Sequence, residues 1–264
     1  FLFGFPLAIL YLTFLHYIQS ILLTLSFTPR YVLYIVIAGI SQIAATALMV
    51  QLFKQKNYAI GVGLAKSEAI LAALIGASLL SDHLSALGWF GVALGGLAVF
   101  LLSKGPRAEK LSMATLLIGI GSGLCFAITS LLVREASLEL PQLPFIHRAA
   151  WVLISIIGFQ CISMLMYLSL FSRQTLKAMW ARLGLTFKVS LCSFIASLGW
   201  FTAMSMQSVA IVKTLGQIEI LFSLLISSYF FKEKLARAEH WGLLLVVVAA
   251  MLVNMTLSRL ITLE

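Results

Sequence analysis

One stretch of the sequence, residues 57–94, occurs twice. Shifted by about 150 positions it matches a second stretch without a gap, and Glu68 then falls on Glu219. Each copy reads as an apolar helix with a glutamate near its start, a polar turn that contains an acid, and a second apolar helix. The other matched pairs are Ala59 and Ala210, Ile60 and Ile211, Leu64 and Leu215, Leu74 and Leu225, Ile75 and Ile226, Leu84 and Leu235, Gly91 and Gly242, and Leu94 and Leu245. The chain is therefore expected to contain one structural unit twice.

The composition of the chain indicates the environment in which this unit lies. Hydrophobic residues make up 61% of the 264 residues and charged residues only 10%, whereas an ordinary soluble domain carries about 25% charged residues. Apolar runs of about 20 residues are long enough to cross a bilayer. Such runs lie at about 1–25, 31–53, 58–80, 87–103, 111–133, 145–171, 183–206, 209–231 and 240–257. The sequence predicts an all-α fold, a polytopic membrane helix bundle with nine visible spans.

A polar linker at residues 104–110 divides the chain into a first repeat, 1–104, and a second repeat, 105–264. The second repeat holds five predicted spans and the first only four, so we expect a tenth helix before Phe1. When a unit with an odd number of spans is duplicated in one chain, the second copy has the opposite orientation in the membrane. The pattern thus predicts two inverted five-helix repeats, the design of many secondary transporters.

The formal net charge is +9, but the basic residues are scattered through short connections and form no stripe on a polar domain, so a nucleic-acid partner is not expected. Most of them lie on the side where Phe1 starts. By the positive-inside rule that side is cytoplasmic and the C-terminus lies outside. We expect a multi-pass integral protein of the bacterial inner membrane. Its expected partners are a small-molecule substrate and the lipid bilayer, and a homodimer is left open.

Cofactors and metals are not expected. Cys125, Cys161 and Cys192 each sit in an apolar run, which indicates small core residues rather than disulfides or a zinc site. The four histidines show no metal-ligand spacing. The glycine-rich run 119–123 and the pair Gly91 and Gly95 are interpreted as places of close helix packing.

The pattern of a small-residue-rich helix, an acidic turn with leucine, and a following helix with an early glycine resembles the paired EamA-like units of the drug/metabolite transporter superfamily. In this sequence the turns are 82–85 and 233–235, and the early glycines are Gly91 and Gly242. The segment 119–151, with Arg148 at the start of its second helix, is similar to the opening of such a unit. This resemblance implies a ten-helix, inverted-repeat carrier of small metabolites or drugs.

Four ionisable residues inside the apolar runs are the main candidates for a site: Lys66, Glu68, Lys213 and Glu219. A charge at mid-bilayer costs about 2.5 to 3.5 kcal/mol, so such residues tend to face a cavity or a partner. Lys213 and Gln217 are four apart and share a helix face. We predict that this face and Lys66 line the cavity, with each glutamate towards a neighbouring helix or the opposite lysine.

Two hypotheses follow for these charges. In the functional one, Glu68 or Glu219 binds a proton or a substrate cation, and the lysines hold an anionic group. In the structural one, two internal ion pairs fix helix packing, with Lys213 reaching from a helix end towards the membrane surface. Weaker substrate-binding candidates are Gln42, which would otherwise bond across helices, and Trp200, which would otherwise anchor the interface.

The charges and the inverted repeat predict a secondary transporter that works by alternating access, either an exporter of amino-acid-like solutes or a carrier coupled to protons. A Walker motif is absent from the sequence, which argues against ATP as the energy source. A non-transporting scaffold and an intramembrane enzyme are the alternatives. Catalytic residues are not predicted, because Asp82 is the only aspartate and Ser122 has no histidine in a paired position.

Overall fold

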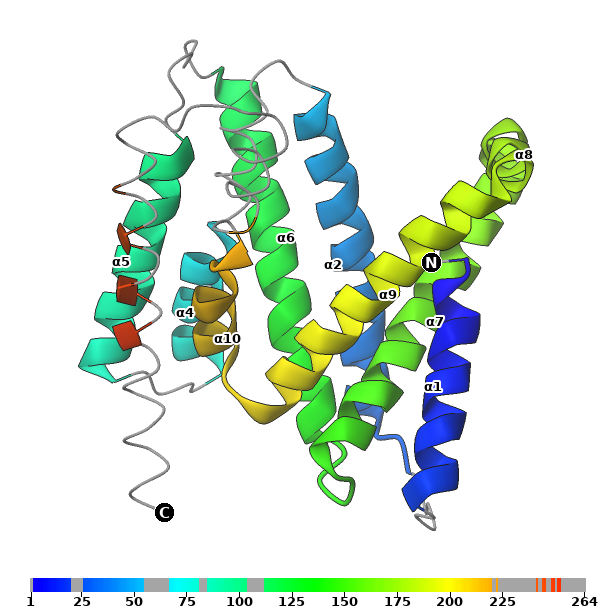
Figure 1. Ribbon diagram of the computed structural model, residues 1–264, viewed down its shortest axis with the longest axis horizontal. Coiled ribbons are helices and arrows are strands. Elements are labelled where there is room, and N and C mark those ends of the chain that lie inside the picture. Colours follow the sequence, from blue (N-terminus) through cyan, green and yellow to red (C-terminus); the bar gives the residue numbers. More distant parts are fainter. Residues whose placement is uncertain are drawn as a thin grey trace. The chain divides into compact units, whose positions relative to one another are not determined.

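The computed structural model describes residues 2–19, 26–54, 67–80, 85–103 and 112–219, together with 222, 241, 244–245, 248–249 and 251–252. Within these residues every regular element is a helix (Figure 1). The helices are α1 (Gly4–Gln19), α2 (Pro29–Phe53), α4 (Glu68–Leu79), α5 (Ala86–Ser103), α6 (Met113–Leu138), α7 (Phe145–Phe171), α8 (Arg173–Ala181), α9 (Leu183–Met206) and α10 (Val209–Gly216). Four of them, α2, α6, α7 and α9, are long and apolar enough to cross a membrane. The predicted polytopic membrane helix bundle is confirmed.

Hydroxyl side chains fix several helix starts. The Oγ1 atom of Thr28 accepts a hydrogen bond from the backbone N–H of Tyr31 at 3.0 Å, with Pro29 between them as the first residue of α2. The Oγ atoms of Ser85 and Ser112 accept backbone bonds three residues on at the starts of α5 and α6. Each hydroxyl satisfies a backbone donor that a helix start leaves without a partner, and proline is well suited to the first helical position.

Helix α6 continues to Leu138, past the predicted end at residue 133. The sequence places Arg134 there, and a charge beside an apolar run normally marks a helix end. In the structure, one guanidinium nitrogen of Arg134 donates to the backbone oxygens of Met204 and Gln207, at 3.0 and 2.7 Å. The charge is therefore satisfied within the protein and α6 has no reason to stop before it.

The predicted span at residues 209–231 is interrupted. Helix α10 ends at Gly216, and the backbone N–H groups of Gln217 and Ile218 bond to Thr214 and Leu215, three residues back, at 3.2 and 3.1 Å. Such tightened bonds are common where an α-helix ends, and glycine is a poor residue for a helix interior. Of the predicted spans 58–80 and 240–257, the structure describes α4 and a few single residues. The predicted turns 82–85 and 233–235 lie, except for Ser85, outside the described residues.

The chain divides into two compact units, which are described separately. Unit 1 comprises residues 1–43 and 132–207, and unit 2 comprises 44–131 and 208–264. Each unit combines segments from both predicted sequence repeats. The repeats themselves, with their inverted relationship, stay a prediction.

Unit 1 is built around α7, which packs against α1 and α9. Its buried face includes Leu153 and Ile156, both 0% exposed. Gly158 lets the ring of Phe5 approach closely, since a Cβ at that position would lie 2.8 Å from the ring. Gln160 donates to the side-chain oxygen of Gln42 at 2.7 Å and joins α7 to α2.

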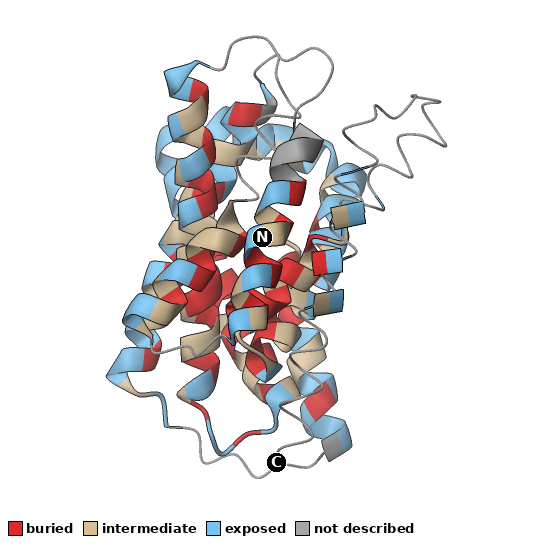
Figure 2. Cartoon of the chain, turned by 90° about the vertical axis from the view of Figure 1, so that its left-hand side faces the viewer, coloured by how far each residue is buried: buried red, intermediate tan, exposed pale blue. Residues whose placement is uncertain are grey.

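In unit 2, α4, α5 and α10 pack against one another. Ala73, Val92 and Ala210, one from each helix, form the buried cluster. The two alanines let the helix backbones approach closely, as small residues commonly do between membrane helices. Each of the long helices of the protein carries both buried and exposed residues (Figure 2), and many of the exposed ones are large and hydrophobic. Such exposure is expected of helices that face lipid.

Candidate functional site

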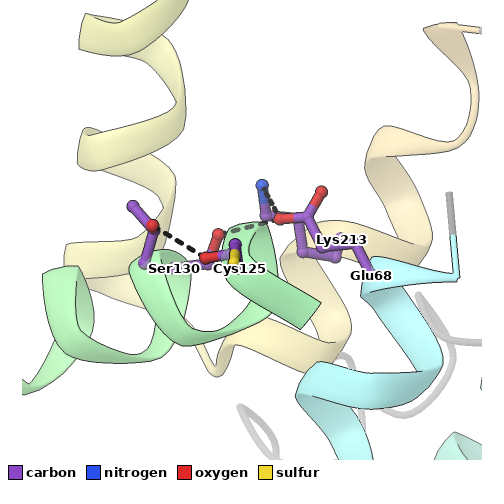
Figure 3. Close-up of polar contacts among 5 residues, drawn as sticks. Glu68, Cys125, Ser130 and Lys213 are labelled. Carbon is purple, nitrogen blue, oxygen red and sulfur yellow. Dashed lines mark hydrogen bonds and ion pairs between the residues drawn. The ribbon is translucent and has the colours of Figure 1, made fainter. Parts of the chain in front are cut away.

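The clearest polar site of unit 2 is centred on Glu68. The ammonium group of Lys213 lies 2.7 Å from Oε1 of Glu68, and the two side chains are only 12% and 14% exposed. The hydroxyl of Ser130, on α6, donates to the same carboxylate oxygen at 2.9 Å. Figure 3 shows Lys213 and Ser130 reaching Glu68 from different helices. Glu68 thus receives a charged and a neutral donor in a largely buried position.

The two charges sit at helix ends that favour them. Glu68 is in the first turn of α4 and Lys213 in the last turn of α10. A helix start carries a partial positive charge and a helix end a partial negative one, so a carboxylate and an ammonium are stabilised there, each by about 0.3 to 1 kcal/mol. The arrangement lowers the cost of holding charged groups at depth.

Gln217 lies beside this pair on the same helix face as Lys213. Its side chain is 3% exposed, and neither amide atom has a hydrogen-bond partner among the described residues. Gly95 on α5 lies so close that a Cβ there would clash with the amide oxygen. The hydroxyl of Ser67 is likewise buried without a partner in the described part of the chain. The site therefore offers unmet donors and an acceptor next to an ion pair.

The other predicted site residues are distributed as follows. Lys66 lies outside the described residues. Glu219 follows the end of α10 and is exposed. Gln42 and Trp200 belong to unit 1, where Gln42 is paired with Gln160 and Trp200 is partly buried on α9. The structure thus brings Glu68, Lys213 and Gln217 into unit 2 and places Gln42 and Trp200 in unit 1.

Arg148, which the family resemblance places at the start of a helix, lies in the first turn of α7 and bonds to the loop before it. Its guanidinium donates to the backbone oxygens of Leu143 and Pro141 at 2.6 and 2.8 Å. The neighbouring His147 is 1% exposed, and neither ring nitrogen has a partner among the described residues. Arg148 thus has a structural part in shaping the loop before α7.

Ser130 is the member of the site that the sequence does not single out. A serine in an apolar helix usually bonds to its own backbone, as the neighbouring Thr129 does with the backbone oxygen of Cys125. The pair Thr129-Ser130, two hydroxyls in the middle of α6, is a weak signal of a polar contact. Only the packing of α6 in unit 2 shows that the contact is with Glu68.

The polar groups of this cluster carry both charges and both kinds of hydrogen-bonding group. The pair holds one charge of each sign, and the amide of Gln217 adds a donor and an acceptor. Among the described residues, His, Cys, Asp and Glu side chains form no group of three or more that could hold a metal.

These features define a multi-pass membrane protein with a buried polar cluster inside an apolar helix bundle. The family model of the EamA-like transporter family matches residues 113–255, more than half of the chain. The chain therefore belongs to the EamA-like transporter family and is a membrane transporter of the drug/metabolite superfamily, as the sequence pattern predicted.

Curated proteins gave no match to the chain. Solved structures are similar to it, and one, described only as "Crystal structure of protein", has a TM-score of 0.57 and 14% identity, covering 95% of this chain and 96% of its own. At this identity the likeness shows the fold alone. It indicates that the arrangement of helices is shared nearly end to end.

Proposed function

We propose that the protein is a secondary transporter that moves a small solute carrying both a carboxylate and an ammonium group, such as an amino acid, by alternating access. The ion pair between Glu68 and Lys213 is the observation that carries the proposal. We place the carrier in the bacterial inner membrane and assign it export. No reaction chemistry is required of it.

The ion pair favours a solute with both charges for an electrostatic reason. Two charges in a membrane interior are tolerated when each has a partner, whereas one unpaired charge is expensive. A zwitterion can replace the internal pair because its carboxylate takes Lys213 and its ammonium takes Glu68. Every charge keeps a partner during the exchange, so the barrier to opening the pair stays low.

The helix interruption supports the same proposal. Transporters commonly bind their solutes where membrane helices are broken, because the helix ends there present backbone groups and partial charges to the solute. Here α10 ends at Gly216 and α4 begins at Glu68, and the pair lies at those two ends. The unmet amide of Gln217 adds hydrogen-bond capacity beside them.

Proton coupling is the second candidate for the same carboxylate. Protonation of Glu68 would remove its charge and release Lys213 to bind an anionic group. Ser130, which donates to Glu68 in the present arrangement, could then accept from the protonated acid, because a hydroxyl both donates and accepts. A proton gradient that drives counterflow in liposomes would support this coupling.

The test is counterflow of radiolabelled amino acids in liposomes that contain the purified protein. Glu68→Gln and Lys213→Gln should each abolish uptake while the protein still inserts and purifies as the parent does. The matched control is Glu139→Gln, which removes a carboxylate that accepts a hydroxyl hydrogen bond from Thr28 at 2.6 Å in unit 1. The control should transport normally.

Exchanging the charges of Glu68 and Lys213 distinguishes a role of the ion pair in transport from a role in helix packing. In the double variant Glu68→Lys with Lys213→Glu the attraction is kept and only its direction is reversed. If the pair merely holds helices together, this variant should regain part of the stability together with transport. If it binds the solute, only part of the stability returns, because each exchanged charge now sits at the helix end that disfavours it. Transport does not return, because a zwitterion held in its original orientation meets a like charge at each end. Full transport by the exchanged variant refutes the proposal.

A further inference from the structure

Helix α8 differs from every other described helix in having no buried residue. It follows directly on α7, which ends at Phe171, and precedes α9, which begins at Leu183. Since both neighbours are long and apolar enough to span the membrane, the nine residues of α8 must lie at one membrane surface.

The residues of α8 are arranged for such a position. Arg173 and Lys177 are four apart and lie on one edge of the helix, while Leu176 and Trp180, also four apart, lie next to them. Trp180 is 55% exposed. A short helix with a basic edge beside an edge of leucine and tryptophan typically lies flat at the boundary between headgroups and acyl chains.

The basic residues of this region have no acidic residue close to them in the sequence. Arg173, Lys177, Arg182 and Lys188 are all exposed, and residues 140–218 contain no aspartate or glutamate. Arg173 donates from Nε to the backbone oxygen of Ser169 at 2.8 Å, which leaves the rest of its guanidinium available. Within the described residues, these cations form no ion pair with the protein. Four positive charges thus lie along one surface segment with no acidic partner in the described part of the chain.

The aromatic residues that flank α8 place it at the level of the headgroups. Tyr167 and Phe171 at the end of α7 lie with their rings 5.3 Å apart, and both side chains are exposed. Tyrosine and tryptophan are enriched at the membrane interface. The phosphates of the lipids lie at this same level, next to the basic edge.

We propose that α8 and its flanks form a binding site for anionic phospholipids, whose phosphates contact Arg173, Lys177, Arg182 and Lys188 while Leu176 and Trp180 enter the acyl region. The complementary charge and the shared depth identify the occupant, because a soluble partner would have to displace headgroups to reach the basic edge. This site is separate from the Glu68 site and does not depend on which solute is carried.

The test is a titration of the purified full chain in neutral detergent with phosphatidylglycerol or phosphatidylcholine, with bound lipid counted by native mass spectrometry. The double variant Lys177→Gln with Arg182→Gln should bind phosphatidylglycerol about 25-fold more weakly, because each basic residue near an anionic surface contributes about fivefold. Phosphatidylcholine binding should not change. Inorganic phosphate at matched ionic strength should not displace the lipid, since it lacks the acyl chains that hold the lipid at Trp180.

The matched control is Arg30→Gln with Lys54→Gln, which removes two exposed positive charges at the ends of α2. Its phosphatidylglycerol affinity should stay close to that of the parent. A charge-retaining variant, Lys177→Arg with Arg182→Lys, should bind as the parent does and guards against a folding effect. Equal losses in the two neutralised variants, unchanged binding in the α8 variant, or displacement of the lipid by phosphate would each overturn the proposal.

Discussion

Gly95 on α5 lies directly against the side-chain amide of Gln217, where α10 ends. A methyl group at position 95 would clash with the amide oxygen of Gln217, which is buried at 3% exposure. Gly95→Ala should therefore move this amide and disturb the neighbouring ion pair. We expect a higher KM for transport, measured by counterflow. The change in thermal stability, measured by unfolding in detergent, should be small.

The control for this substitution is Gly199→Ala on α9. A Cβ there would meet no atom within 4 Å, so the substitution changes only helix propensity, which favours alanine by up to about 1 kcal/mol. Transport should be unchanged and thermal stability equal or slightly higher. Equal transport by the two variants would show that the amide of Gln217 has no part in solute binding.

The ion pair should behave as a coupled unit in stability measurements. Among the described partners of Glu68, Lys213→Met leaves its carboxylate only the Ser130 hydroxyl. An uncompensated buried charge costs about 3 to 5 kcal/mol. Adding Glu68→Gln removes that charge, so the double variant should be more stable than Lys213→Met alone. Thermal unfolding of four proteins measures this: the parent, Lys213→Met, Glu68→Gln and the double variant. Strictly additive losses would mean that the two residues do not interact.

Much of the fold is readable from the sequence because lipid imposes simple rules. The ranges 145–171 and 183–206 were predicted from apolar length and turn signals alone, and they coincide with α7 and α9. The same rules are less informative in the polar connections between spans. The basic connection between those spans forms the helix α8, whose alternation of basic and apolar residues suits a membrane surface and is too short to show in an average of hydrophobicity.

The site is only partly readable. A glutamate in an apolar helix must have a partner, so the sequence indicates that Glu68 contacts a lysine or a neighbouring helix. It does not say which lysine, since that depends on how α4 and α10 pack. Nor does it show that Gly216 ends a helix within the predicted span, because isolated glycines are frequent inside membrane helices. The partner and the break both come from tertiary packing.

The contact between Gln42 and Gln160 predicts a structural effect in unit 1. Gln160 is 0% exposed and donates to the side-chain oxygen of Gln42 at 2.7 Å. Gln42→Leu removes the acceptor, and such bonds between membrane helices contribute about 0.6 kcal/mol on average. We expect a small fall in unfolding temperature with an unchanged KM. A large change in KM would instead assign Gln42 to the binding site, as the sequence alone suggested.

The end of α9 offers the last prediction. One guanidinium nitrogen of Arg134 donates to the backbone oxygens of Met204 and Gln207, where the helix end carries a partial negative charge. Hydrogen bonds from charged groups contribute about 1.5 to 3 kcal/mol, so Arg134→Gln should destabilise the protein by about 2 kcal/mol. Hydrogen exchange should rise locally at the amide of Gln207, which bonds to Ala203 at 3.0 Å.

Arg134→Lys separates the two parts of this contribution. A lysine keeps the positive charge near the helix end but lacks the planar group that reaches two carbonyl oxygens together. It should therefore recover part of the stability, with exchange at Gln207 between that of the parent and that of Arg134→Gln. If the lysine variant exchanges as slowly as the parent, the charge alone holds the end of α9. If Arg134→Gln also exchanges at Gln207 as slowly as the parent, the hydrogen bonds of Arg134 do not stabilise the end of α9. The extension of α6 to Leu138 would then need another cause.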